Sequence, residues 1–182
     1  QAFICHGNHD PLDGWRANLS WPDTAYQFGD EPEGHALRKD DVDSPVVFGV
    51  SYPSREVREN LIPRFPTGNT GHAAIGLLHA NVGQDTGHEN YAPCTITDLV
   101  DTGYAYWALG HVHTRNVLRG IGDGAPLVVY PGNPQGRHIN ETGARGVYIV
   151  EMDNTGVVSE LNFHPLDIVR WEILQIAIDD LN

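Results

Sequence analysis

Apolar residues along the chain gather in short runs that polar, glycine-rich or proline-rich stretches separate. Runs of about four to eight residues, rich in β-branched or aromatic side chains, predict strands rather than helices. Two runs, 146–152 and 157–163, flank a turn-forming Asp-Asn-Thr-Gly sequence and predict a hairpin, and alternation over 169–178 predicts a final half-buried strand. The other predicted strands are residues 2–5, 25–28, 45–50, 72–80, 104–109, 117–118 and 127–130.

Helix signals are fewer. Residues 54–61 carry helix formers after a serine that can cap them, and a proline follows. A second short helix is predicted in TITDLVDTG, with Thr95 or Thr97 as its N-cap and a glycine at its end. The stretch 11–44, rich in Asp, Gly, Pro and Trp, is expected to form a long surface connection. Since strands dominate, the predicted fold class is α/β, a layered mixed β-sheet sandwich flanked by helices.

Length and composition narrow the class of protein. The 182 residues favour one domain, and contents of 40% apolar and 19% charged residues are typical of a soluble globular protein. No apolar run reaches the roughly 20 residues that span a bilayer, and no charged-then-apolar leader opens the sequence, so a cytoplasmic location without membrane contact is expected. The net charge of −13 argues against a broad basic surface for nucleic acid. It leaves room for a nucleic-acid enzyme, because carboxylates gathered around divalent metals shift the charge in the same direction.

Polar clusters follow four of the predicted strands at the point where each strand ends. Because ligand sites in layered α/β folds lie where such strand ends converge, we expect these clusters to share one edge of the sheet. Imidazole nitrogen and amide oxygen suit divalent ions such as Mn²⁺, Fe²⁺ and Zn²⁺. The sequence therefore predicts a metal site, with Asp10 as the partner that fixes the tautomer of His9. The four clusters are Gly7-Asn8-His9-Asp10, His79, Gly110-His111-Val112-His113 and Pro131-Gly132-Asn133.

Each cluster also has a simpler interpretation when it is taken alone. A single histidine at a strand end, such as His79, is often a hydrogen-bonded structural residue, and residues 7–10 have the composition of a turn. A lone His-x-His pair is equally weak evidence. The occurrence of all these clusters, each at a predicted strand end, favours metal chemistry.

The order of these motifs is similar to that of a known family. GNHD at 7–10, the histidine of GLLHA at 76–80 and GHVH at 110–113 resemble motifs III, IV and V of the calcineurin-like metallophosphoesterases. The wider sequence, with HENYAPC at 88–94 and YPGNPQGRHINETGARGVYIVE at 130–151, resembles the SbcD-like DNA repair exonucleases. The resemblance covers nearly the whole chain and implies the metallophosphoesterase fold.

The resemblance also implies a role for each matched residue. His113 would bind a first metal ion, and His9 would be the acid or base that faces the scissile phosphate, oriented by Asp10. Two divalent ions, expected to be Mn²⁺ with Fe²⁺, Zn²⁺ and Mg²⁺ as alternatives, would activate the water that attacks phosphorus in line. The ligands of the second ion would be Asn8, His79 and His111.

The chain departs from the family pattern before Gly7. The first two family motifs, Asp-x-His and Gly-Asp-x-x-Asp, supply the bridging carboxylate and further ligands, and neither occurs there. We therefore expect residues 1–165 to be the C-terminal portion of a metallophosphoesterase domain, and 166–182 to hold the final strand and the start of a connection to a further segment. The chain alone is expected to bind at most one metal ion weakly and to be inactive, because nothing would offset the mutual repulsion of two cations.

Two further residues, Arg137 and His138, follow the predicted turn after residue 130 at the same edge. Arg137 could bind a substrate phosphate through its bidentate guanidinium group, and His138 could do so when protonated. The alternative is a solvated pair of loop residues.

The leading prediction is the phosphoesterase domain of a Mn²⁺-dependent DNA repair exonuclease. The resemblance implies DNA as the substrate, an ATPase of the long coiled-coil repair type as a partner, and a homodimer. Two alternatives stay open. One is a metallophosphoesterase that acts on small phosphodiesters or phosphoproteins, and the other is a degenerate, non-catalytic phosphoesterase fold that serves as a scaffold.

Overall fold

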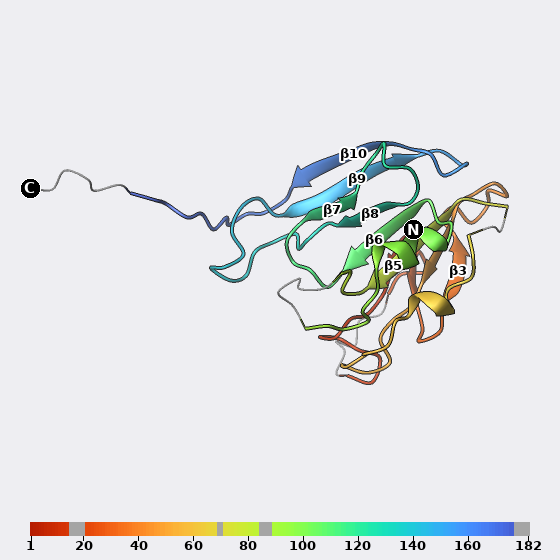
Figure 1. Ribbon diagram of the computed structural model, residues 1–182, viewed down its shortest axis with the longest axis horizontal. Coiled ribbons are helices and arrows are strands. Elements are labelled where there is room, and N and C mark those ends of the chain that lie inside the picture. The colour runs from red at the N-terminus through yellow and green to blue at the C-terminus, as the bar shows by residue number, and fades with distance from the viewer. Residues whose placement is uncertain (15–20, 69–70, 84–88, 177–182) are drawn as a thin grey trace, which may run out of the picture.

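A six-stranded mixed sheet forms the centre of the computed structural model, which describes residues 1–14, 21–68, 71–83 and 89–176 (Figure 1). Its strands lie in the order β3-β4-β5-β6-β8-β7. β4, β5, β6 and β8 run parallel, whereas the edge strands β3 and β7 are antiparallel to their neighbours. The parallel strands therefore end at one common edge. The bounds are Glu33–Ala36 (β3), Val46–Gly49 (β4), Ala74–His79 (β5), Tyr106–Gly110 (β6), Asn116–Arg119 (β7) and Leu127–Tyr130 (β8).

Two smaller sheets accompany the large one. β1 (Ala2–Ile4) pairs in parallel with β2 (Ala25–Gln27), and β9 (Gly146–Met152) pairs antiparallel with β10 (Val158–Pro165). The guanidinium carbon of Arg115 lies 4.1 Å from the ring centroid of Phe163, which ties the β9–β10 hairpin to the segment before β7. The fold is thus a mixed α/β arrangement made mainly of sheet, and the predicted fold class is confirmed.

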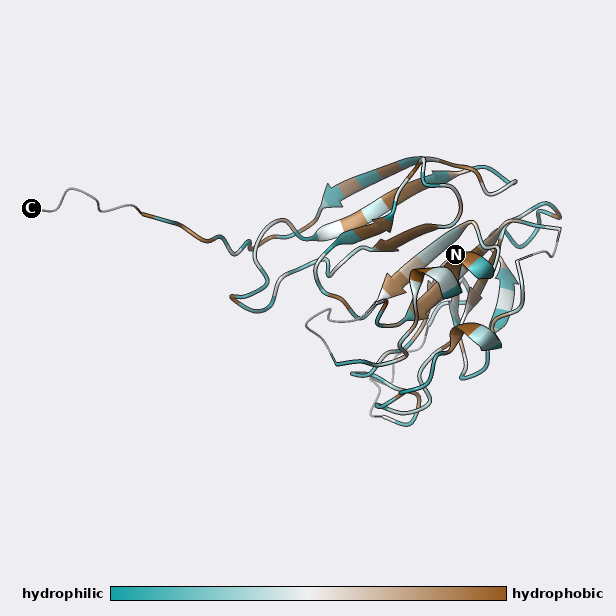
Figure 2. Cartoon of the chain, in the orientation of Figure 1, coloured by the Kyte–Doolittle hydropathy of each residue, from teal (hydrophilic) through white to brown (hydrophobic). Residues whose placement is uncertain are grey.

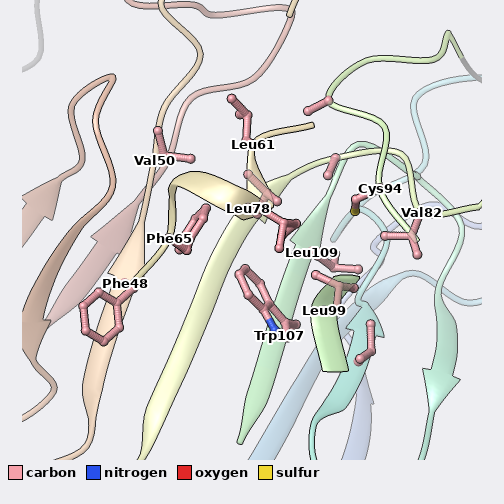
Figure 3. Close-up of a cluster of buried hydrophobic side chains, with 14 of the residues drawn as sticks. Phe48, Val50, Leu61, Phe65, Leu78, Val82, Cys94, Leu99, Trp107 and Leu109 are labelled. Atoms are coloured by element: carbon pink, nitrogen blue, oxygen red, sulfur yellow. The ribbon is translucent and has the colours of Figure 1, made fainter. Parts of the chain in front are cut away.

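The hydrophobic core gathers around Trp107 in β6, where the 3-10 turn η1 (Ile62–Arg64) and helix α1 (Ile96–Asp101) meet the sheet (Figure 3). Trp107 is fully buried, and its ring stacks on Tyr104 with 4.9 Å between centroids. Gly76 in the neighbouring strand makes room for it, because a Cβ atom there would lie 2.2 Å from the indole ring. Apolar residues accordingly dominate the central strands (Figure 2).

Helix α1 begins and ends as the sequence predicts. Thr95 is its N-cap: the Thr95 hydroxyl accepts a hydrogen bond from the Asp98 amide at 3.1 Å, and the Asp98 carboxylate accepts one from the Thr95 amide at 2.7 Å. This reciprocal capping box satisfies two amides that the first helical turn leaves unpaired. Gly103, with a φ of +73°, follows the helix in the left-handed region that glycine adopts without a steric cost. Within the described residues, no helix is both long enough and apolar enough to cross a lipid bilayer.

The helix predicted over residues 54–61 is wrong. The segment is irregular, and the helical turn begins only at Ile62, whose amide donates to the Asn60 side chain at 2.9 Å. Val57 and Leu61 are both buried, and the Val57 carbonyl accepts a hydrogen bond from the Ala92 amide at 2.7 Å. A tertiary contact with the loop after β5 thus takes the place of a helical hydrogen bond.

Two further differences concern strands. β3 lies within the stretch 11–44 that was expected to be a surface connection, whereas the other predicted strands before residue 165 are confirmed. The final strand is wrong over 169–176, where the only pairing in the described chain is an isolated bridge between Thr142 and Trp171, and 177–178 lie outside the described residues. The Gln135 side chain forms hydrogen bonds with the backbone of this segment instead. Its Oε1 accepts from the Ile168 amide at 2.9 Å, and its Nε2 donates to the Val169 carbonyl at 2.7 Å.

Candidate metal centre

The parallel register of the sheet brings two of the predicted ligands together. β5 and β6 are paired so that His79 lies opposite Gly110, which places His79 beside His111. The two imidazole centroids are 5.1 Å apart, and the rings meet edge to face. The expected convergence of strand ends is therefore seen for β5 and β6.

Three donor atoms meet at this edge. Asn8 Oδ1 lies 2.9 Å from His79 Nε2, and His79 Nε2 lies 3.3 Å from His111 Nδ1. Two ligands of one ion, each roughly 2.1 Å from it, are separated by roughly 3.0–3.4 Å in octahedral or tetrahedral geometry. The separations match those of neighbouring ligands around a single cation. One amide oxygen and two imidazole nitrogens also form a donor set suited to Mn²⁺, Fe²⁺ or Zn²⁺.

The tautomer of His111 is set by its other nitrogen. His111 Nε2 lies 2.8 Å from the Glu89 carbonyl oxygen, which can only accept, so Nε2 carries the proton and Nδ1 keeps its lone pair. His111 is buried, and its φ of +98° is strained for a residue with a side chain. The backbone strain turns Nδ1 of His111 toward the other two donor atoms.

His79 is held as a neutral imidazole. Burial is the main cause that lowers the pKa of His79 to about 3, and the charge of His111 is the second. The neighbouring His9 and His113 act in the same sense, and Asp10 opposes them. The neutral ring donates from Nε2 to Asn8 Oδ1, which can only accept, and a metal ion bound at Nε2 would take the place of that proton.

The glycines before the polar clusters leave space for the His79 ring. A Cβ atom on Gly7 would lie 2.4 Å from both Cε1 and Nδ1 of His79, and one on Gly110 would lie 2.9 Å from Nδ1. The backbone of both loops thus contacts the imidazole directly.

His113, the fourth predicted ligand, interacts with a residue that the sequence pattern did not single out. His113 Nδ1 lies 2.7 Å from Glu141 Oε1, and Asn133 Nδ2 donates to the same oxygen at 2.9 Å. Burial alone would raise the pKa of Glu141, but hydrogen bonds from the Arg137 amide and from His113 hold it below the usual value. Glu141 could have been found in the sequence by its position, since it lies in the same loop after β8 as Asn133.

The role predicted for Asp10 needs a correction. One Asp10 oxygen lies 2.9 Å from His6 Nδ1, and the other accepts the Gly7 amide at 2.9 Å. The carboxylate therefore orients His6 and closes the loop, rather than orienting His9, which is exposed. His6 is buried because its backbone is tied to the segment after β4, with its amide donating to Ser51 Oγ at 3.0 Å.

The structure brings the turn at Arg137 and His138 next to His113. The backbone amides of Arg137 and His138 donate to Glu141 Oε2 at 2.7 and 3.2 Å, on the carboxylate whose other oxygen contacts His113. Both side chains are exposed. Their binding to a substrate phosphate stays a prediction.

A complete metal centre is not present in the described part of the chain. No group of three or more His, Cys, Asp or Glu side chains among the described residues could hold an ion, and the convergent set is two imidazoles with one carboxamide. His88, in the loop after β5, lies outside the described residues. The residues present fit part of the coordination sphere of one ion, and among the described residues His113 does not join His79 and His111 in a group that could hold it.

Comparison with known proteins gives a related sequence. No family model matches the chain. The chain is similar to the uncharacterized metallophosphoesterase YhaO of Bacillus subtilis (strain 168), with 37% identity over 179 residues. The aligned part is 98% of this chain but 42% of the relative, so the chain spans less than half of that protein's length. This similarity supports the metallophosphoesterase superfamily.

Proposed function

We propose that this chain is part of a metallophosphoesterase that hydrolyses phosphodiester bonds in DNA as a repair exonuclease. The observation that carries the proposal is the meeting of Asn8 Oδ1, His79 Nε2 and His111 Nδ1, with successive separations of 2.9 and 3.3 Å. These separations match those between neighbouring ligands of one cation, so an ion could replace the hydrogen bonds that link the three side chains. The similarity to a relative named as a metallophosphoesterase supports the same class of chemistry.

The candidate ligands would divide between two metal ions. Asn8, His79 and His111 would hold one ion and His113 would contribute to another, with Mn²⁺ preferred and Fe²⁺, Zn²⁺ or Mg²⁺ as alternatives. When bound, such ions supply charge neutralisation for phosphate oxygens and lower the pKa of water.

The other residues would handle the proton and the substrate. His9 follows Asn8 directly and is exposed at the tip of its loop, where it can give a proton to a leaving oxygen or take one from water. The guanidinium of Arg137 can bind a non-bridging phosphate oxygen pair as a bidentate donor, and His138 can assist when protonated. Both lie in the loop that contacts His113. The substrate phosphate would therefore be held next to the metal edge, the edge of the sheet at which Asn8, His79 and His111 meet.

DNA as the substrate is supported by the resemblance of HENYAPC at 88–94 and YPGNPQGRHINETGARGVYIVE at 130–151 to the SbcD-like exonucleases. A coiled-coil ATPase partner and a homodimer belong to the same proposal. Because the net charge is −13, binding of the DNA phosphate backbone would then depend largely on bound cations or on a partner.

The test compares two substrates with the complete protein and Mn²⁺. Linear duplex DNA should be degraded, H111A should abolish this, and H164A should not, because His164 lies exposed in β10 away from the cluster. Hydrolysis of bis-p-nitrophenyl phosphate without any degradation of DNA would overturn the exonuclease assignment. Absence of both activities in the folded, Mn²⁺-loaded protein would overturn the phosphodiesterase assignment and favour a scaffold.

A further inference from the structure

The carboxylate of Glu141 lies at the centre of the loop that follows β8. Its Oε1 accepts Asn133 Nδ2 at 2.9 Å and contacts His113 Nδ1 at 2.7 Å, while its Oε2 accepts the amides of Arg137 at 2.7 Å and His138 at 3.2 Å. Both oxygens therefore face only donors. The Glu141 side chain is 16% exposed, so water replaces these contacts poorly.

The backbone of His113 is fixed by the same loop. Its carbonyl oxygen accepts the Asn133 amide at 3.1 Å and also the Arg145 guanidinium, and Arg145 is buried. Arg145 in turn donates to Asn133 Oδ1 at 3.2 Å and to the Thr142 carbonyl at 2.9 Å. The segment after β8 thus fixes both the main chain and the imidazole of His113.

We propose that Glu141 is a positioning residue of the metal edge: it fixes His113 in the tautomer with the proton on Nδ1 and anchors the Arg137–His138 turn beside it. A carboxylate can only accept, so His113 Nδ1 must donate and the lone pair of the neutral ring lies on Nε2. Carboxylates in this position orient metal-binding histidines and raise their basicity. One side chain would then couple metal binding to phosphate binding. The proposal rests on the proposed function for the phosphate-binding part alone.

The substitution E141Q keeps the size of the side chain and removes one of its two acceptor oxygens. Glutamine has the same shape but must place an NH₂ group where one of the two oxygens was. If the NH₂ faces His113, Nδ1 must become the acceptor, and the proton moves to Nε2. If it faces the amides of Arg137 and His138, donors oppose donors and the turn is released.

The matched control is E33Q. Glu33 also accepts a backbone amide, that of Gly29 at 3.1 Å, and also lies beside a histidine, with Oε2 3.7 Å from His35 Nε2. It lies on the edge strand β3, away from the cluster. The Glu33 side chain is 41% exposed, so E33Q controls for the loss of a charged amide acceptor beside a histidine.

The first measurement is the ring ¹⁵N–¹H correlation spectrum of the metal-free complete protein, at a pH where His113 is neutral. The wild type should show His113 with its proton on Nδ1. The proton on Nε2 would overturn the proposal, and this result does not depend on any variant folding.

The second measurement is Mn²⁺ titration of the wild type, E141Q and E33Q, with KM and kcat for bis-p-nitrophenyl phosphate beside it. E141Q should weaken Mn²⁺ binding by about 10- to 100-fold, the usual effect of losing an outer carboxylate, and E33Q should not change it. If the NH₂ group faces the turn, KM at saturating Mn²⁺ should also rise more than kcat falls, because the released turn binds phosphate less well. Wild-type Mn²⁺ affinity in E141Q would overturn the proposal. A protein without hydrolytic activity that still shows the tautomer and the Mn²⁺ effect would refute the proposed function and leave the role of Glu141 intact.

Discussion

Adding one methyl group at Gly7 should displace the candidate ligands, because the new Cβ atom would overlap the His79 ring. The Cβ atom of G7A would lie 2.4 Å from Cε1 and Nδ1 of His79 and 2.7 Å from Cγ. Non-bonded carbon atoms approach to about 3.5–4.0 Å, so the overlap is about 1.1 Å or more. The φ of Gly7 is not in the left-handed region, so the backbone itself accepts alanine and only the ring is in the way.

The size of the effect follows from how the overlap is relieved. Either the His79 ring or the loop that carries Asn8 must move by about 1 Å, and either movement breaks the 2.9 Å approach of Asn8 Oδ1 to His79 Nε2. Metal sites tolerate deviations of about 0.2 Å in ligand distances. Misplacement of a functional group by about 1 Å can cost about 100-fold, which corresponds to about 2.7 kcal/mol.

Mn²⁺ titration calorimetry of the complete protein measures this directly. G7A should bind Mn²⁺ about 100-fold more weakly than the wild type. G29A is the matched control, because a Cβ atom on Gly29 meets only Glu33 Oε1, at an ordinary contact distance of 3.7 Å. Thermal unfolding of both variants checks that the fold is kept. Wild-type Mn²⁺ affinity in G7A would show that His79 is not a ligand, and the geometric basis of the site would be lost.

Three further outcomes are expected. Titration of the isolated 182-residue chain with Mn²⁺ should show at most one weak site, and two tight sites would contradict the need for further ligands. D10N should weaken Mn²⁺ binding by about tenfold, because asparagine cannot accept hydrogen bonds from both His6 and the Gly7 amide. D13N, at an exposed position, should leave Mn²⁺ binding unchanged, and equal affinities of D10N and the wild type would show that the loop keeps its shape without the Asp10 carboxylate. W107A should lower the free energy of unfolding by about 3–5 kcal/mol in urea, while W21A, whose side chain is 48% exposed, should stay within about 0.5 kcal/mol; a small loss for W107A would mean that the core refills the cavity.

The parts of the fold that could be predicted from sequence are those decided locally. β5, β6 and β8 are nearly continuous apolar runs, as strands buried in a parallel sheet must be, and α1 carries both its caps within a few residues. The segment 54–61 shows the opposite case, since its helix formers are overruled by a hydrogen bond from a loop more than thirty positions later. The segment after residue 165 has a strand pattern, but Gln135 supplies its hydrogen bonds instead of a strand.

The same division holds at the candidate site. Asn8, His79 and His111 could be found from sequence because each lies at or after the end of a strand, and the parallel register then brings His79 and His111 to one edge. The partner of Asp10 could not, because adjacency in sequence favours His9 whereas the turn closes back onto His6. Local spacing identifies which side chains a strand end presents. It does not identify which distant group receives their second hydrogen bond.

Asp10 and Glu141 show why those second contacts differ in consequence. Each carboxylate accepts backbone amides with one oxygen and faces an imidazole Nδ1 with the other. Asp10, however, contacts His6, which is not a candidate ligand, so its loss would displace the loop that carries Asn8 and leave every ligand tautomer unchanged. Glu141 contacts a candidate ligand itself, so a glutamine there that turns its NH₂ group toward His113 would also move a proton on that ring. Ring ¹⁵N spectra of D10N and E141Q should therefore differ at His113 even if both variants bind Mn²⁺ equally weakly, and an unchanged His113 signal in both would mean that neither substitution changes the tautomer of a candidate ligand.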